Sequence, residues 1–285
     1  MRLMYINYFQ CAISLNLVDI HEFFYTPRKK KKQKNKEIYM GNFINNAPFA
    51  LVIVFLIIGF VLLIKGADFF VEGSSSVAKR LHVPSIIIGL TIVAMGTSLP
   101  ETAVSVSASV TGNNELAVSN VVGSNIFNLM VVIGVCAMIA TVNVAKETIK
   151  RDIPFSLICA GLLLLLGILG FGDKSGMTLG HFDGVIFIGA FAGYILYMIK
   201  IALKASKEGK KVEIEGGSDE DIKLIPVPLS ILFIIGGAIA IAIGGDMTVD
   251  AASRIASDLG MSQTLIGLTI VSIGTCLLYT SPSPR

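Results

Sequence analysis

The stretch "GLTIVAMGTSLPETAVS", residues 89–105, is an apolar segment interrupted by Gly96, Pro100 and the carboxylate of Glu101. A charged side chain at the centre of a bilayer costs about 3 kcal/mol on insertion scales, so a glutamate in such a segment needs a partner or a function. Proline removes an amide donor and clashes with the preceding turn, and the carbonyl groups near Gly96 therefore lose their helical partners. The stretch predicts a broken helix whose freed oxygen atoms lie beside a carboxylate.

The composition predicts an all-α polytopic membrane protein. Of the 285 residues, 53% are hydrophobic and 15% are charged, and the mean hydropathy is +0.75. This is too apolar for an ordinary soluble domain. About seven apolar runs approach or exceed the ~20 residues that span a bilayer core. These runs are residues 48–65, 85–110, 116–140, 153–170, 184–202 and 226–244, and a seventh that begins at Gln263.

The residue types of common catalytic sites are scattered. The four cysteines show no paired spacing, and "HEFF" at residues 21–24 lacks the second histidine of a zinc-protease helix. The sequence also contains no GxSxG motif, no cofactor-binding loop and no paired aspartates within the apolar runs. We therefore expect neither an enzyme nor a bound cofactor.

The placement of lysine and arginine predicts the orientation, because cytoplasmic loops are enriched in both. If the segment before Pro48 is external, the external loops hold Lys174 and Arg254. The cytoplasmic side then holds Lys65, Lys79, Arg80, His82, Lys146, Lys150, Arg151, Lys200, Lys204, Lys207, Lys210, Lys211 and Lys223. The basic cluster at residues 28–36 falls on the wrong side. We interpret residues 1–39 as a non-native or disordered extension before a start at Met40; the alternative is a basic tail that binds anionic lipid.

An internal repeat connects the two ends of the chain. A shift of 178 positions aligns residues 66–97 with residues 244–275 without a gap, and it pairs Asp68 with Asp246 as well as the two "GLTIV" motifs. Five spans separate equivalent points, and an odd number places the copies in opposite orientations. Inverted repeats are typical of secondary transporters, whose substrate site lies near the midplane between the halves.

The repeat divides the chain into segments. Residues 40–204 form a first half of five helices, residues 205–225 a charged, glycine-containing cytosolic linker, and residues 226–275 the start of a second half. The last ten residues, 276–285, read "CLLYTSPSPR". We interpret them as the translation of a sequencing adaptor.

The "GTSLPE" motif predicts a cation site. Thr97 and Glu101 are four residues apart and share a helix face, with Ser98 on its flank. Hydroxyl, carboxylate and freed carbonyl oxygens together suit a hard cation such as Ca²⁺ or Na⁺, whereas a soft metal would need thiolate or imidazole. The alternative is a proline kink with a glutamate paired to a neighbouring helix.

The next helix carries a polar stripe. Asn120, Ser124 and Asn128 recur every four residues in an apolar segment, and we expect them to face inward. They favour cation coordination, with a bridge between helices as the alternative. Asn125 is off the stripe and is expected to pack. Ser105 is a weaker candidate, because membrane hydroxyls often bond to their own helix.

These motifs resemble the cation/calcium exchanger superfamily. "GTSLPE" followed by "GNNELAVSNVVGSNIFN" is similar to the first alpha repeat of bacterial inner-membrane sodium/calcium antiporters, and "GLTIVSIGT" to the opening of the second. The resemblance implies the inverted-repeat sodium/calcium exchanger fold, with 5+5 helices when complete. It also implies exchange of external Na⁺ for internal Ca²⁺ by alternating access.

The resemblance also implies a set of cation ligands. They are Glu101, the side-chain oxygens of Thr97 and Ser98, the backbone carbonyl of Ala94, Ser124 and Asn128, and in the second half Ser272 and Thr275. The family has serine, leucine, proline and glutamate where this chain has residues 276–279, "CLLY". One carboxylate leaves a divalent ion about one charge short of balance, so we expect the chain as written not to transport.

We expect the intact gene product to be a calcium/sodium antiporter of the bacterial cytoplasmic membrane. Its partners would be the lipid bilayer and its substrates, Ca²⁺ and Na⁺, with a need for K⁺ left open and no nucleic acid involved. A proton/calcium exchanger of the same superfamily is the nearer alternative, because Glu101 could carry a proton. A cation channel is the more distant one, because inverted repeats favour alternating access.

Overall fold

The computed structural model describes residue 44 and residues 47–81, 83–141, 149–150, 153–169, 181–207 and 224–276. Within these ranges the chain is helical and contains no strand. The helices, with π-helical turns marked η, are α3 (Phe49–Arg80), α4 (Ser85–Ile88), η1 (Gly89–Val93), α5 (Ala94–Gly96), α6 (Leu99–Val110), α7 (Asn114–Ile126), η2 (Phe127–Val132), α8 (Ile133–Ile139), α9 (Ile153–Leu169), α10 (His181–Lys207), α11 (Val227–Leu259), α12 (Gln263–Ile266), η4 (Gly267–Val271) and α13 (Ser272–Cys276).

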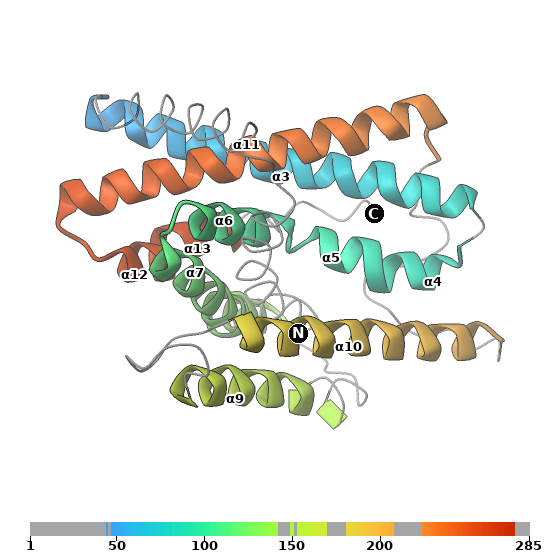
Figure 1. Cartoon of the computed structure of the whole chain (residues 1–285). Coiled ribbons are helices and arrows are strands. Elements are labelled where there is room, and N and C mark those ends of the chain that lie inside the picture. Colours follow the sequence, from blue (N-terminus) through green and yellow to red (C-terminus); the bar gives the residue numbers. More distant parts are fainter. Residues whose placement is uncertain are drawn as a thin grey trace.

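Two long helices, α3 and α11, lie side by side and antiparallel (Figure 1). Small residues meet at their contact at intervals of seven: Gly59 with Gly244, Gly66 with Gly237, and Gly73 with Ser230. A methyl group on Gly66 would lie only 2.9 Å from the carbonyl oxygen of Gly237. Small residues let helix backbones approach closely, which is how helices pack where lipid removes the hydrophobic driving force.

The same contacts show that the repeat is inverted. In the repeat, Gly66 is equivalent to Gly244, and Gly59 is equivalent to Gly237. If each residue is replaced by its equivalent in the other copy, the contact between Gly59 and Gly244 maps onto the observed contact between Gly237 and Gly66. A two-fold axis therefore passes between the helices near Leu63, and such an axis lies in the membrane plane. The prediction of two oppositely oriented halves is confirmed.

Each half also contains a short helical segment of the same design. In both, the "GLTIV" motif forms a π-helical turn, and the helices on either side begin or end at equivalent residues. Thr91 donates to the carbonyl of Ile87 at 2.7 Å, and the equivalent Thr269 donates to that of Leu265 at 2.6 Å. In Figure 1 these segments approach the centre of the molecule from opposite sides.

The first half confirms the predicted helix break. α5 ends at Gly96, Ser98 has a non-helical backbone with φ −107° and ψ 8°, and α6 starts at Leu99 with Pro100 in its first turn. Proline is tolerated in a first turn because the amide it lacks has no helical partner there.

The extent of α3 differs from the predicted apolar run. The run ends at Lys65, but the helix continues to Arg80, and Lys65 pairs with Asp68 at 3.2 Å one turn later. Lys65 therefore lies near the middle of α3, two residues past Leu63, rather than at the end of a helix. An ion pair between residues three apart stabilises a helix. It supports α3 at the point where the apolar run ends.

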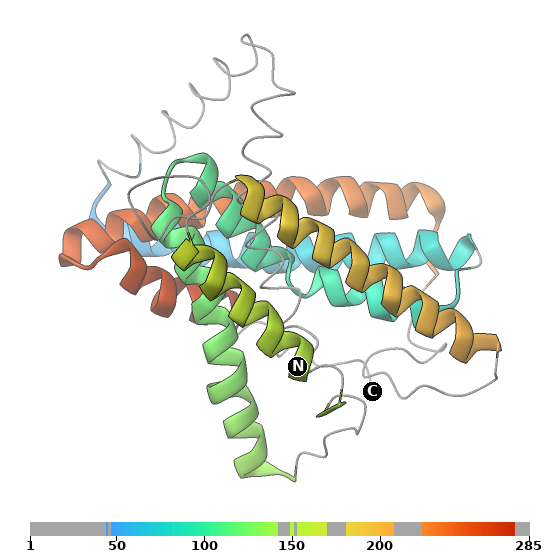
Figure 2. The same cartoon turned by 60° about the horizontal axis from the view of Figure 1, so that its bottom comes forward.

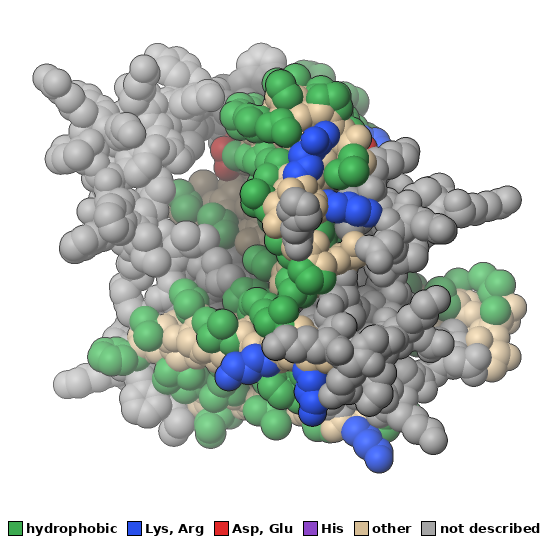
Figure 3. All heavy atoms as spheres, turned by 90° about the vertical axis from the view of Figure 1, so that its right-hand side faces the viewer, with side chains coloured by type: hydrophobic (Ala, Val, Ile, Leu, Met, Phe, Trp, Pro, Cys, Tyr) green, Lys and Arg blue, Asp and Glu red, His purple; other side chains and the backbone are tan. Residues whose placement is uncertain are grey.

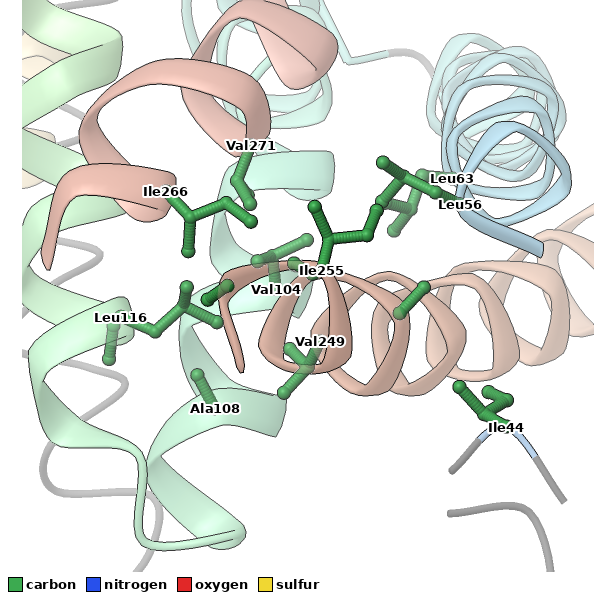
Figure 4. Packing of buried hydrophobic residues seen from close by; sticks show 14 of the residues in the cluster. Ile44, Leu56, Leu63, Val104, Ala108, Leu116, Val249, Ile255, Ile266 and Val271 are labelled. Carbon is green, nitrogen blue, oxygen red and sulfur yellow. The ribbon is translucent and has the colours of Figure 1, made fainter. Parts of the chain in front are cut away.

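The larger apolar core joins both halves (Figure 4). Val104 and Leu116 of the first half pack with Val249, Ile255 and residues of the α12–η4 segment. A second cluster joins α9 and α10, where Phe155 stacks on Tyr194 with ring centroids 4.6 Å apart. Figure 2 shows η2 and α8 running away from the rest of the described helices.

Several helices are long and apolar enough to cross a membrane. In the described part of the chain four qualify, over Phe49–Arg80, Asn114–Ile139, Phe182–Ile201 and Val227–Leu259, and two shorter apolar helices cover Ile153–Ile168 and Gln263–Cys276. The protein is thus an all-α, multi-pass membrane protein. The predicted extension (1–39) is outside the described residues, as are most of the linker (208–223) and the tail from 277 onward.

Candidate cation-binding site

Glu101 lies in the first turn of α6, directly after the helix break, and only 1% of it is exposed. A helix N-terminus carries partial positive charge, which stabilises a carboxylate at this position. Ser105 follows one turn later on the same face and is fully buried. The break therefore places an acidic group and a hydroxyl inside the protein rather than towards lipid.

Asn120 of α7 faces these two residues. Its side-chain nitrogen donates to the backbone carbonyl of Glu101 at 3.2 Å and to Ser105 Oγ at 3.1 Å. Ser105 in turn donates to the carbonyl of Ala117 at 3.2 Å. These bonds join the helix that carries the carboxylate to α7.

The second half completes the cluster. Ser124 Oγ and Ser272 Oγ both donate to the carbonyl of Asn120, at 2.7 and 3.0 Å. The Cys276 sulfur lies 3.7 Å from Glu101 Oε1 and 3.7 Å from the carbonyl oxygen of Ser124. By the repeat, Cys276 is the equivalent of Ser98, so the second half places the residue equivalent to Ser98 against the carboxylate.

The other predicted ligands lie around this cluster. Ser98 is buried at the break, and Thr97, which is half-buried, donates from Oγ1 to the carbonyl of Ala94 at 2.9 Å. Thr275 is buried and donates to carbonyls of its own segment. Asn128 is half-buried in η2. Direct bonds thus connect Glu101, Ser124 and Ser272 through Asn120 and Cys276, while ligand roles for the full set remain predictions.

Two residues of the cluster, Asn120 and Ser105, are only weakly indicated by the sequence. The sequence indicates Asn120 only as part of the polar stripe and Ser105 only as a weaker candidate, although the spacing of four residues between Glu101 and Ser105 predicts a shared helix face. Asn125, expected to pack, is 3% exposed, and neither polar atom of its amide has a partner in the described structure.

The cluster consists of oxygen groups around one carboxylate, with the single thiol of Cys276 beside them. Within the described ranges no three His, Cys, Asp or Glu side chains gather as a metal site. Carboxylate, hydroxyl, amide and carbonyl oxygens suit Na⁺ and Ca²⁺, whereas zinc and copper favour thiolate and imidazole.

Comparison with known proteins places the chain in a family. The model of the sodium/calcium exchanger protein family matches residues 51–200 and 229–278, which include Glu101, the helix break before it and most of the two long helices α3 and α11. The chain belongs to the sodium/calcium exchanger family. The match extends to residue 278, two residues past Cys276, where α13 ends.

Relatives of the exchanger occur in bacteria and archaea. CaxA of Alkalimonas amylolytica is 38% identical over 229 residues, which are 79% of this chain and 67% of CaxA. The inner membrane protein YrbG of Escherichia coli is 29% identical over 80% of this chain and 68% of its own length. The sodium/calcium exchanger MaX1 of Methanosarcina acetivorans is 29% identical over 78% of this chain and 70% of its own. The solved sodium-calcium exchanger NCX_Mj aligns with a TM-score of 0.47 and 29% identity, over 81% of this chain and 71% of NCX_Mj.

Proposed function

We propose that this exchanger extrudes Ca²⁺ in exchange for Na⁺ across the bacterial cytoplasmic membrane. The observation that carries the proposal is the position of Glu101, a nearly fully buried carboxylate at a helix break that contacts both halves of an inverted repeat. A buried carboxylate is stabilised by a bound cation, and two cations that need the same carboxylate exclude each other. Because Na⁺ and Ca²⁺ would compete for one site, the protein would exchange one ion for the other instead of letting both cross independently.

The fold supports alternating access to that site. Inverted halves give a transporter two related conformations, one open to each side, in which the halves move around a fixed site. Here the bonds of Ser272 and Cys276 to the first half cross the boundary between the halves. A relative movement of the halves would therefore change the surroundings of Glu101 directly.

The relatives support the ions and the location. MaX1 is named a sodium/calcium exchanger and YrbG an inner membrane protein. We extend both properties to the full-length product of this gene. Sodium is preferred over protons because the break offers neutral hydroxyls beside the carboxylate, and Na⁺ takes oxygen ligands of this kind.

Replacing the carboxylate tests the function. In vesicles that contain the full-length product, Glu101→Gln should reduce Ca²⁺ uptake driven by an imposed Na⁺ gradient to the level of empty vesicles, because an amide cannot balance the cation's charge. Glu115→Gln is the matched control, because Glu115 is exposed at the start of α7. Undiminished uptake by the Glu101 variant would refute the proposal.

The same vesicles distinguish the coupling ion. Uptake that follows a pH gradient and ignores a Na⁺ gradient would replace sodium by protons, with Glu101 as the proton carrier. Uptake driven by the Na⁺ gradient at constant pH supports the exchange proposed here.

A further inference from the structure

The orientation of the Asn120 side-chain amide is fixed by its neighbours. Ser105 Oγ already donates its proton to Ala117, and the carbonyl of Glu101 can only accept, so both need a donor from Asn120. The nitrogen therefore faces α6. The amide oxygen faces away from these two acceptors and has no donor among the described residues, in a side chain with 0% exposure.

The backbone of Asn120 makes a second set of bonds. Its carbonyl accepts from Ser124 Oγ at 2.7 Å and, in the second half, from Ser272 Oγ at 3.0 Å, whose proton is shared with the carbonyl of Gly267 at 2.5 Å. The approach of the halves here is close, because a methyl group on Gly123 would lie 2.7 Å from the carbonyl oxygen of Leu268. One residue thus contacts α6, its own helix and the second half.

The first turn of α6 needs such an anchor. Its initial amides have no partner within the helix, and the break at Ser98 separates it from α5. Glu101 lies in this turn, so any tilt of the turn moves the carboxylate. A side chain that binds both the Glu101 carbonyl and Ser105, one turn later, holds the turn at two points.

We infer that Asn120 is a positioning residue, which holds Glu101 in place and connects it to the second half through Ser272. This inference rests on the proposed function in taking Glu101 as the cation-binding carboxylate. Asn120 itself acts through its donated hydrogen bonds and does not bind the ion.

Cys276 provides a test that needs no transport. Its sulfur lies against Glu101 and is 2% exposed, so its alkylation rate reports whether the first turn of α6 stays packed. In this chain, with the other three cysteines replaced, Asn120→Ala should raise the rate of N-ethylmaleimide labelling about tenfold, since two hydrogen bonds are lost. An unchanged rate would overturn the inference.

Ser119→Ala is the matched control for this experiment. Ser119 is the preceding residue, is 4% exposed, and donates to the carbonyl of Leu116 within its own helix. Its replacement should leave the labelling rate at the parental value. Size-exclusion profiles identify variants that fail to fold, and for those Ser105→Ala, which removes one of the two bonds, takes the place of Asn120→Ala.

Calcium dependence separates positioning from coordination. In the full-length product, Asn120→Ala should raise the half-saturating Ca²⁺ concentration about tenfold, and Asn120→Asp should do the same, because a carboxylate cannot donate to the Glu101 carbonyl. If Asn120→Asp keeps or tightens the Ca²⁺ dependence, the amide oxygen is a ligand and the positioning role is wrong.

The two experiments fail in different ways. If the unmodified full-length product shows no Na⁺-driven Ca²⁺ uptake, the proposed function is refuted, while labelling of Cys276 still tests the role of Asn120. If uptake is normal but neither labelling nor Ca²⁺ dependence responds to Asn120→Ala, the function stands and the positioning role is refuted.

Discussion

At the scale of single residues, three polar side chains of α7 and η2 differ in their surroundings although their spacing in sequence is regular. Ser124 is fully buried and bonds at the site, whereas Asn128 is half-buried. Asn128 lies in the π-helical turn that begins at Phe127, whereas Ser124 lies in α7 before it. A π-turn inserts an extra residue into the helix, so a spacing of four residues is a weaker indication of a shared face there than in a regular α-helix.

Asn128 remains a predicted ligand, and a pair of variants tests it. Asn128→Ala should raise the half-saturating Ca²⁺ concentration of the full-length product severalfold, because it removes one coordinating oxygen. Asn125→Ala is the comparison: this amide is 3% exposed on the same helix and has no bond in the described structure to lose. Equal Ca²⁺ curves for Asn128→Ala and the unmodified protein would assign Asn128 to packing.

At the scale of elements, two neighbouring glycines of α11 differ in how much the packing of α3 against α11 depends on them. A methyl group on Gly237 would lie 2.6 Å from the carbonyl oxygen of Gly66, whereas one on the adjacent Gly236 would meet nothing within 4 Å. Gly237→Leu should force the helices apart at a cost of about 1–3 kcal/mol and lower the thermal unfolding temperature in detergent. Gly236→Leu should leave it unchanged, and equal melting of the two variants would contradict this packing.

Sequence patterns could predict some elements of this fold and not others, for physical reasons. Pro100 cannot continue a helix from the preceding turn, so the break followed from local chemistry, and a charged side chain in an apolar segment is expected to avoid lipid, which predicted the burial of Glu101. The course of α3 beyond Lys65 did not follow, because hydropathy falls there while the helix continues through an ion pair. The bond from Ser272 to Asn120 was not predictable, because it depends on which face of α7 meets the second half.

At the scale of the whole molecule, the distribution of charged residues predicts an orientation in the membrane. Lys79 and Arg80 end α3, and Lys200 and Lys204 lie near the end of α10. Figure 3 shows lysine and arginine side chains gathered on this end of the molecule. The opposite end of α11 has a balanced pair instead, Arg254 with Asp258 at 3.0 Å. The positive-inside rule therefore predicts that the basic end is cytoplasmic.

Two residues that are equivalent in the repeat can be used to test this orientation. Leu81 and Leu259 are equivalent residues at the ends of α3 and α11, and they are 72% and 56% exposed. In a cysteine-free background, a membrane-impermeant maleimide added to intact cells should label the Leu259→Cys variant and spare the Leu81→Cys variant, which should react only in inside-out vesicles. Because the two positions are related by the inverted repeat, labelling of both from one side would refute the inversion itself. Labelling with the sides exchanged would keep the inversion and reverse the orientation, so that the basic end faces outward.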